Sequence, residues 1–336
     1  MTLDAQPAPP VPAGGELPAP GVPAPRTAPT LRVLTYNILA GGGARVAAIE
    51  QVIRAARPDV VGLQEVVRPD VLIALAHKLG MYYAFAPSRS GWHVGALSRW
   101  PILEERGHGG QWMKRAMLEM LIQPPDGMAV RLFILHLRAY FSGPRAGEAA
   151  RLAELDYVLG RLGDARAARE PHLVLGDFNS LAPGERLRAT ALLRHVLAVR
   201  ARQQVPGEPL YGHPTVHHVL PPALQPFGKL LGAALANRPV AAVFDAAVSA
   251  LAPRAVITRM GEAGYADCYA LAHPDPRARA FTCPLPTPAG RIDYIFASPA
   301  LATRLVACDV PVDAPDCPVL GASDHAPMVA EFRLGA

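Results

Sequence analysis

The chain has 336 residues, of which 51% are hydrophobic, enough to bury one large core or two modest ones. Its formal net charge is +5, but Lys and Arg are spread along the chain without a run of five, so charge alone does not indicate a polyanionic partner. The four cysteines lack the paired spacing of zinc sites, which favours reduced thiols over a Cys308–Cys317 bridge, since a bridge would require export.

Residues 1–30 are rich in Pro and Ala, carry little charge and show no periodic apolar face, so we expect a disordered tail. No basic cluster precedes an unbroken apolar stretch there, and Pro interrupts it repeatedly, which argues against a secretory signal. Later apolar stretches contain charges or prolines, so no transmembrane segment is expected. These observations predict a cytoplasmic protein, and a monomer is the default because no heptad pattern is visible.

After the tail, short runs rich in Val, Ile and Leu predict strands, and amphipathic patterns between them predict helices. The predicted strands are 31–36, 60–63, 94–97, 117–122, 130–135, 172–175, 292–296 and 328–332, and the predicted helices are 45–57, 71–79 and 152–162. Most of these strands contain little charge, so we expect burial on both faces. Hairpin-like pairs with outer helices predict an α/β sandwich of two packed sheets rather than an alternating Rossmann pattern.

Residues 182–260 are too many for an ordinary connection and are predicted to form an insertion near one end of the core. Apolar residues from Leu230 to Val248 predict helices, either a pair that covers the core, which we favour, or a lid that touches lipid. Its histidines His213, His217 and His218 have no carboxylate or cysteine at ligand spacing, so they are interpreted as loop residues.

Polar residues stand where the predicted buried strands end, a position from which side chains project into a site at a sheet edge. These residues are Asn37, Glu65, His136, Asp177, Asn179, Asp293, Asp324 and His325. Each alone has an ordinary explanation, such as a turn asparagine, a surface acid or a hydrogen-bonded core histidine. Together they supply the carboxylates, amides and imidazoles that a hard divalent cation and a phosphate require. The sequence therefore predicts a metal-dependent site for phosphoester hydrolysis.

Six short motifs carry a family resemblance. They are TYN (35–37), QE (64–65), LH (135–136), GDFNS (176–180), RIDYIF (291–296) and SDH (323–325). In this order and strand context, the set resembles the endonuclease/exonuclease/phosphatase superfamily over about residues 31 to 334. The resemblance implies that residues 31–336 form a four-layer α-β-β-α sandwich of two packed mixed sheets flanked by helices. It also implies an Mg²⁺- or Mn²⁺-dependent hydrolase in which an activated water attacks phosphorus in line.

The resemblance also assigns expected roles to the metal-binding and water-positioning residues. Asn37, Glu65 and Asp324 would bind Mg²⁺ or Mn²⁺, with Glu65 as the principal carboxylate ligand. Asp177 and Asn179 would position and activate the attacking water and contact the phosphate. A hard cation with oxygen ligands suits this inventory.

The expected roles of the histidines follow from the same resemblance. His136 would hold a non-bridging phosphate oxygen. His325 would be oriented by Asp293, because a carboxylate partner fixes the imidazole tautomer and raises its pKa. Whether Asp177 or His325 removes the proton from water is left open at this point.

The predicted centre does not name the substrate, because the superfamily acts on many phosphoesters with nearly the same residues. The expected partner is a nucleic acid, a phospholipid or a small phosphate ester, with a phosphodiester favoured. A sphingomyelinase-like head-group phosphodiesterase and an inositol or sugar phosphate monoesterase are the alternatives. No interleaved basic and aromatic stretch for single strands is visible, and DNA repair is not favoured. A catalytically silent binding module is disfavoured, because every expected acid, amide and imidazole is present.

Overall fold

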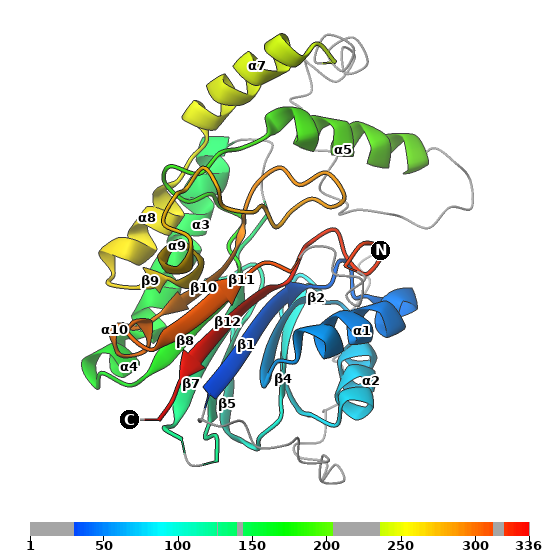
Figure 1. Ribbon diagram of the computed structural model, residues 1–336. Coiled ribbons are helices and arrows are strands. Elements are labelled where there is room, and N and C mark those ends of the chain that lie inside the picture. The colour runs from blue at the N-terminus through cyan, green and yellow to red at the C-terminus, as the bar shows by residue number, and fades with distance from the viewer. Residues whose placement is uncertain (1–29, 126, 140–143, 204–235, 312–318, 336) are drawn as a thin grey trace.

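The computed structural model describes residues 30–125, 127–139, 144–203, 236–311 and 319–335 (Figure 1). Most of the predicted tail lies outside these ranges, as do His213, His217, His218, Leu230 and Cys317. The described cysteines are all free thiols, of which Cys268 and Cys308 are buried and Cys283 is partly exposed.

Two six-stranded sheets form the centre of the molecule. The first has the order β11-β12-β1-β2-β4-β3 and the second has the order β5-β6-β7-β8-β10-β9. The strands of the first sheet are β1 (Thr30–Asn37), β2 (Val60–Val66), β3 (Tyr82–Ala86), β4 (His93–Ser98), β11 (Leu305–Asp309) and β12 (Met328–Arg333). Those of the second are β5 (Ile102–His108), β6 (Met117–Ile122), β7 (Val130–His136), β8 (His172–Asp177), β9 (Ala266–Asp267) and β10 (Asp293–Ala297).

Both sheets are mixed, because each combines one parallel pair with antiparallel pairs. The parallel pairs are β1 with β2 and β7 with β8. A parallel pair brings the carboxyl ends of its two strands to the same edge of the sheet. The described fold is thus the predicted sandwich of two mixed sheets.

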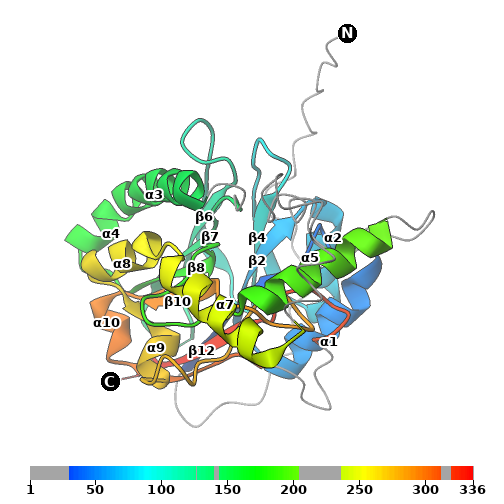
Figure 2. The same ribbon diagram turned by 90° about the horizontal axis from the view of Figure 1, so that it is seen from above.

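Helices surround the two sheets (Figures 1 and 2). They are η1 (Gly43–Arg45), α1 (Val46–Ala56), α2 (Pro69–Leu79), α3 (Pro144–Arg161), α4 (Gly163–Ala167), α5 (Ala189–Gln203), α7 (Arg238–Leu251), α8 (Ala255–Glu262), α9 (Cys268–Ala272) and α10 (Pro299–Ala302). Helices α1 and α2 lie beside the first sheet, whereas α3, α4 and α8 lie beside the second. The arrangement is the four-layer α-β-β-α sandwich that the sequence predicted.

Side-chain alternation explains why the central strands are apolar on both faces. In β7, Leu132 and Ile134 belong to the core between the sheets, while Phe133 and Leu135 pack in a second cluster with α3 and α8. Because successive side chains of a strand point to opposite faces, one apolar run fills both layers. The sheets also approach closely, since a Cβ added to Gly62 would lie 2.9 Å from Ile134 Cγ2.

The four strands missing from the sequence prediction are the edge strands of the two sheets. Strand β5 has an exposed run, Leu103 to Gly107, that is rich in Glu and Arg, so it shows neither the apolar run of a buried strand nor strict alternation. Strands β3, β9 and β11 were also not predicted. Edge strands contact one neighbour only, so less of their surface must be apolar.

The helices described within the predicted insertion do not cover the core as we favoured. No residue of α7 is buried, and in its contact with α5 Phe244 packs with Leu193 and Leu197. Asp245 of α7 also accepts hydrogen bonds from the backbone N–H (2.7 Å) and the hydroxyl (2.9 Å) of Thr190 in α5. Val243 and Leu251 are 71% and 85% exposed. In the described residues no single helix is long and apolar enough to span a membrane, although α7 and α8, bent by 47°, pass that test as a pair. The favoured interpretation of a core-covering pair is therefore wrong for α7.

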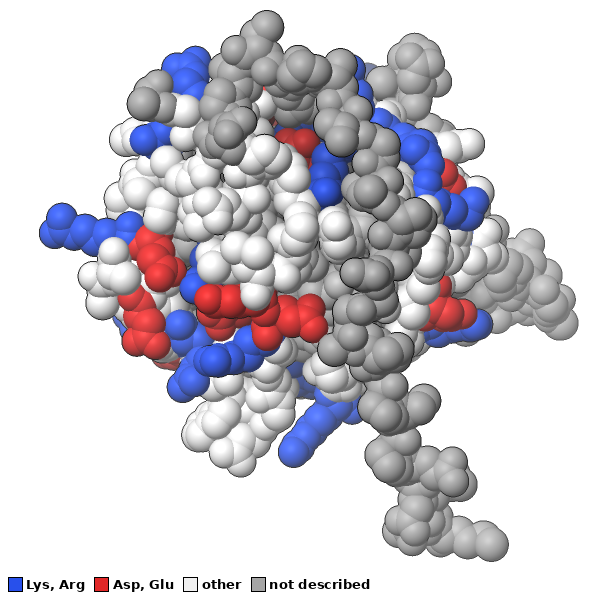
Figure 3. All heavy atoms as spheres, turned by 90° about the horizontal axis from the view of Figure 1, so that it is seen from below, with Lys and Arg blue, Asp and Glu red and all other residues white. Residues whose placement is uncertain are grey.

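The surface charge is mixed rather than uniformly basic. Figure 3 shows acidic side chains flanked by Lys and Arg on the face seen from below. Opposite charges so close together partly cancel their field. The net charge of +5 therefore gives no single-sign patch on the visible part of this face.

Candidate active site

The predicted polar residues meet where strands of the two sheets end. Asn37 lies opposite Gln64 in the parallel β1–β2 pair, and His136 lies opposite Asp177 in the parallel β7–β8 pair. Asp293, the first residue of β10, is opposite Asp177 in the antiparallel pair. All five side chains are buried. Strand register alone therefore places polar groups from both sheets at one edge of the sandwich.

Two further predicted residues, Glu65 and Asn179, have an uncommon backbone conformation at this edge. Glu65 (φ 61°) and Asn179 (φ 49°) lie in the left-handed region, which is uncommon for residues other than glycine. Glu65 sits at a β-bulge of β2, and its Oε2 accepts a hydrogen bond from the Ala40 backbone N–H (2.7 Å). Asn179 donates its backbone N–H to Asp177 Oδ1 (2.8 Å) and its side-chain amide to Leu137 O (3.0 Å).

Asp177 is the centre of the polar cluster. Its Oδ2 accepts a hydrogen bond from Asn37 Nδ2 (3.0 Å) and lies 3.3 Å from His136 Nε2 and 4.0 Å from His325 Nε2. Burial, followed by repulsion from Asp293, raises the pKa of Asp177 to about 7, although His325 opposes the shift. A carboxylate in this setting can exchange a proton near neutral pH or be held as an anion by added positive charge.

His325 is held in place by the C-terminal loop and by β10. Its Nδ1 is 2.9 Å from Asp293 Oδ2, and its backbone N–H donates to Ser323 Oγ (3.2 Å). Ser323 Oγ in turn donates to Asn37 O (2.6 Å), which ties this loop to β1. Burial alone would lower the pKa of His325, but the Asp293 carboxylate raises it well above the ordinary value. The imidazole is therefore fixed in orientation and favours its cationic form.

Arg115 is a site residue that the sequence did not predict. It is buried, its Nη1 donates to His136 Nδ1 (2.7 Å), and the same atom is 3.8 Å from Glu65 Oε1. Its guanidinium also lies 5.6 Å from the ring centroid of Trp92. Because arginine can only donate, His136 Nδ1 must accept, which leaves the ring proton on Nε2 facing Asp177. Burial lowers the pKa of Arg115, and the carboxylates of Glu65 and Asp177 oppose this shift.

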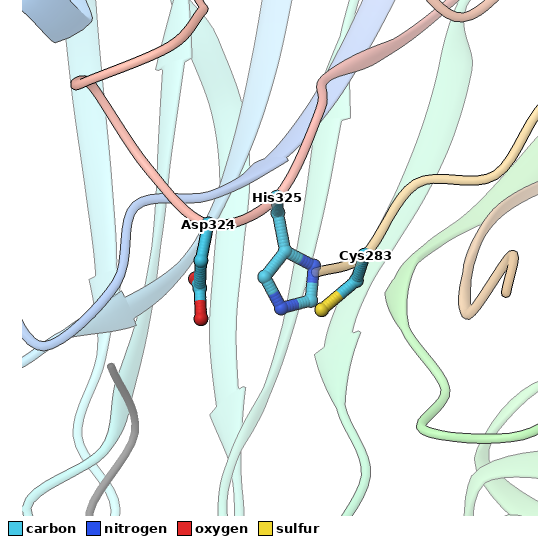
Figure 4. Close-up of side chains that lie close together, drawn as sticks. All are labelled: Cys283, Asp324 and His325. Atoms are coloured by element: carbon cyan, nitrogen blue, oxygen red, sulfur yellow. The ribbon is translucent and has the colours of Figure 1, made fainter. Parts of the chain in front are cut away.

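Asp324 and Cys283 flank His325 (Figure 4). Asp324 precedes His325 in the C-terminal loop, whereas Cys283 comes from the segment before β10, and Figure 4 shows their side chains on either side of the imidazole. One ligand-type atom from each of the three residues lies within 4.8 Å of the others. Burial raises the pKa of the Cys283 thiol to about 12, despite the nearby His325. The thiol is therefore protonated at neutral pH.

The donor atoms at this edge fit a hard divalent cation. Asp177, Asp293 and His325 each offer one ligand-type atom within 4.8 Å of the other two, and all three are buried. Asp293 Oδ1 is buried and makes no hydrogen bond within the part of the chain that the structure describes. Carboxylate oxygens with an amide oxygen nearby are ligands that Mg²⁺ and Mn²⁺ prefer. A cation here would also relieve the repulsion between the two aspartates.

The structure places all eight predicted residues at this edge, but it does not bring all of them into contact. Asn37, His136, Asn179 and His325 surround Asp177, and Asp293 lies opposite it in the β8–β10 pair. Among the described residues, Glu65 belongs to neither of the close groups of potential metal ligands and is linked to the cluster through Arg115. The predicted grouping of Asn37, Glu65 and Asp324 around one ion stays a prediction.

Comparison with known proteins gives consistent results. Residues 34–325 match the model of the Endonuclease/Exonuclease/phosphatase family. Similar solved structures include an AP endonuclease from Archaeoglobus fulgidus (16% identity, TM-score 0.59, covering 90% of this chain and 99% of that one). A 3′ phosphatase, NExo, from Neisseria bound to a product DNA hairpin matches with 18% identity and TM-score 0.56, covering 90% and 99%. A truncated TDP2 from Caenorhabditis elegans matches with 16% identity and TM-score 0.54, covering 90% and 97%. No curated protein matches the chain.

Proposed function

The chain belongs to the endonuclease/exonuclease/phosphatase family, and we propose that it is an Mg²⁺- or Mn²⁺-dependent phosphodiesterase that attacks phosphorus with water. The observation that carries the proposal is the buried convergence on Asp177 of an amide, two imidazoles and a second carboxylate. Buried polar groups are costly unless they are paired, so a fold retains such a cluster where chemistry requires it.

The proposed metal ligands are Asn37, Glu65 and Asp324, with Asp177 and Asp293 close enough to add their charge. When bound, the cation supplies positive charge that stabilises the developing charge on the phosphoryl oxygens. Glu65 is held by the Ala40 backbone N–H, so its carboxylate is oriented before any ion arrives. Such pre-orientation lowers the cost of binding.

The remaining residues position the substrate and handle protons. His136 donates from Nε2 toward the site, because Arg115 holds its Nδ1, and so it can bind a non-bridging phosphate oxygen. Asp177 and Asn179 orient the attacking water, whose oxygen bonds to phosphorus as the ester P–O bond breaks. The water proton passes to Asp177 or to His325, and pH–rate profiles of Asp177→Asn and His325→Gln would separate these two routes.

The test is hydrolysis of bis-p-nitrophenyl phosphate and p-nitrophenyl phosphate by the purified full chain with Mg²⁺, Mn²⁺ or EDTA. We expect diester cleavage that requires metal and is lost in Asp177→Ala. Preference for the monoester would replace the proposal with a sugar or inositol phosphate monoesterase. Metal-independent cleavage, or Asp177→Ala cleaving as fast as the wild type, would contradict it.

A phospholipid head group is a second candidate substrate, because α7 presents apolar side chains to solvent. Val240, Val243 and Leu251 are 47%, 71% and 85% exposed. An apolar face of this kind can lie on a membrane interface. Flotation with phosphatidylcholine vesicles tests it: the wild type should float and Val243→Asp should not. Equal flotation of both proteins would show that the apolar face of α7 does not bind the vesicles.

A further inference from the structure

An exposed aromatic stack lies beside the candidate active site. Trp112, in the loop between β5 and β6, is 60% exposed. Its indole stacks on the Tyr157 ring of α3, with centroids 6.5 Å apart and planes at 12°. The Arg161 guanidinium also lies over the Tyr157 ring, 5.4 Å from its centroid. We call Trp112, Tyr157 and Arg161 the aromatic platform.

Short, specific contacts hold the two parts of the platform, the β5–β6 loop and α3, together. Glu154, Tyr157 and Arg161 are spaced i, i+3 and i+7, so they lie on one face of α3. Buried Glu154 accepts hydrogen bonds from the backbone N–H groups of Lys114 and Arg138, each at 2.9 Å. The loop that carries Trp112 is therefore anchored to the helix that carries the rest of the platform.

The same loop runs directly into the site. Three residues after Trp112, Arg115 contacts His136 and faces Glu65. A chain of three residues spans at most about 10 Å, so the Cα atom of Trp112 lies within that distance of the Cα atom of Arg115, which contacts the site. Position thus favours a ligand that reaches both the platform and the site.

The chemistry of the platform suits a nucleobase. A tryptophan exposed to this degree leaves much apolar ring surface in water, and stacking a flat ring on it would remove that surface. Lys114 and Arg161 are also exposed and would attract the phosphates that flank such a base, and Lys114 contributes more because Arg161 also borders a groove that contains Glu104 and Asp164. Aromatic rings interleaved with basic side chains are the combination that binds single-stranded nucleic acid without strong sequence preference.

We propose that the aromatic platform binds an unpaired base of a single-stranded nucleic acid whose phosphodiester lies in the active site. The inference rests on the proposed function for the nature of the bond, but base binding itself needs no turnover. It names the substrate class that the strand-edge residues alone leave open. A lipid surface is the competing occupant, because an exposed indole also enters membrane interfaces.

The experiment measures binding in EDTA, so that hydrolysis does not interfere. The full chain is titrated into a dye-labelled single-stranded DNA oligonucleotide of mixed sequence and followed by fluorescence anisotropy. We expect Trp112→Ala to weaken binding about 5- to 100-fold, since stacking on one aromatic side chain contributes on that scale. Trp112→Phe should restore most of the affinity, and Arg161→Gln should weaken it less than Trp112→Ala.

Leu271→Ala is the matched control, because Leu271 is an exposed apolar side chain (51%) on α9, and its affinity should equal that of the wild type. Thermal unfolding of each variant checks that the fold is intact. Equal binding by the wild type and Trp112→Ala, or no binding by the wild type, overturns the platform. So does Trp112-dependent binding to phosphatidylcholine vesicles in place of DNA.

The two proposals fail separately. If the protein cleaves diesters but Trp112→Ala does not change its DNA affinity, the proposed function is supported and the platform is contradicted. If the protein binds DNA through Trp112 but hydrolyses no phosphodiester, the platform is supported and the proposed function is contradicted.

Discussion

Two charged regions of the molecule, an outer face of the second sheet and the strand edge formed by both sheets, differ in how their charges are compensated. One is an outer groove of about 750 Å³ between β5–β7 and the helices α3 and α4. There Arg131 forms ion pairs with Glu104, Glu119 and Glu170 at 2.9 to 3.0 Å, and His108 Nε2 lies 2.7 Å from Glu119. The acids around Arg131 share one permanent cation, and several of them reach solvent.

The strand edge is buried and its charges are less well compensated. Asp177 and Asp293 lie opposite each other, buried, and the pKa of Asp177 rises to about 7 through burial and this repulsion. The guanidinium of Arg115 contacts His136 and Glu65 rather than either of these two aspartates. The number of acids alone therefore does not mark the candidate active site. Buried, converging groups with a perturbed pKa do so.

The largest expected effect is on the rate of hydrolysis, which should depend on the strand edge and not on the outer groove. Asp177→Asn should reduce metal-dependent diester hydrolysis by at least about 100-fold, because it removes the carboxylate proposed to orient the attacking water. Glu119→Gln, which neutralises an acid of the outer groove, should leave the rate unchanged. Steady-state kinetics with bis-p-nitrophenyl phosphate measure both. A comparable loss in the two variants would erase the distinction.

A smaller loss of rate is expected at Arg115. Arg115→Lys keeps the charge but cannot hold His136 and face Glu65 in the same geometry, so kcat/KM should fall about 10- to 100-fold. Arg106→Lys, at an exposed position in the outer groove, is the control and should behave as the wild type. Full activity of Arg115→Lys would show that Arg115 acts only as a structural residue.

Substitutions in the outer groove should change the stability of the protein rather than its rate of hydrolysis. Arg131→Met removes the cation shared by three carboxylates, and the free energy of unfolding should fall by about 1 to 2 kcal/mol, a value reduced for their partial exposure. Urea unfolding measures this change. Arg68→Met breaks an exposed pair with Asp70 and should change stability little. An Arg131 variant that loses activity but not stability would contradict the assignment.

The smallest expected effect concerns His172 at the start of β8. Burial lowers its pKa, and its ring is fixed by Tyr265 (2.8 Å) and the Glu170 carbonyl (2.6 Å). The unfolded chain therefore binds a proton more readily than the folded one, so stability should fall as pH drops below about 6.5, the ordinary histidine value.

Thermal unfolding of the wild type and His172→Gln between pH 7.5 and 5.5 would detect this contribution. The variant should lose less stability on acidification than the wild type. His77→Gln, at an exposed position on α2, should follow the wild type. Parallel curves for wild type and His172→Gln would show that His172 does not contribute.

The fold was largely predictable because the central strands are apolar on both faces. Runs such as Val60–Leu63 and Val130–Leu135 must be buried wherever they lie, so composition identified them. The edge strand β5 carries Glu and Arg, and no local pattern distinguishes it from a loop. The behaviour of α7 was not predictable either, because an amphipathic helix has the same sequence whether its apolar face meets the core or solvent.

The sequence predicted the site residues that stand at the ends of strands. It did not predict those that only the fold brings close to them. Asn37, His136 and Asp177 end strands, so the sequence marks them. Arg115 precedes β6 beside Lys114 with no feature that singles it out, and only the fold directs it to His136. The aromatic platform likewise joins residues more than forty positions apart, which explains why no basic and aromatic stretch appears in the sequence.

The central claim is that the strand edge, and not the outer groove, holds a divalent cation. Binding of Mn²⁺ followed by electron paramagnetic resonance tests it directly, with the wild type, Glu65→Gln and Glu119→Gln as matched proteins. The account predicts that the wild type and Glu119→Gln bind an ion that Glu65→Gln binds at least about tenfold more weakly. Loss of the ion in Glu119→Gln with retention in Glu65→Gln would contradict it.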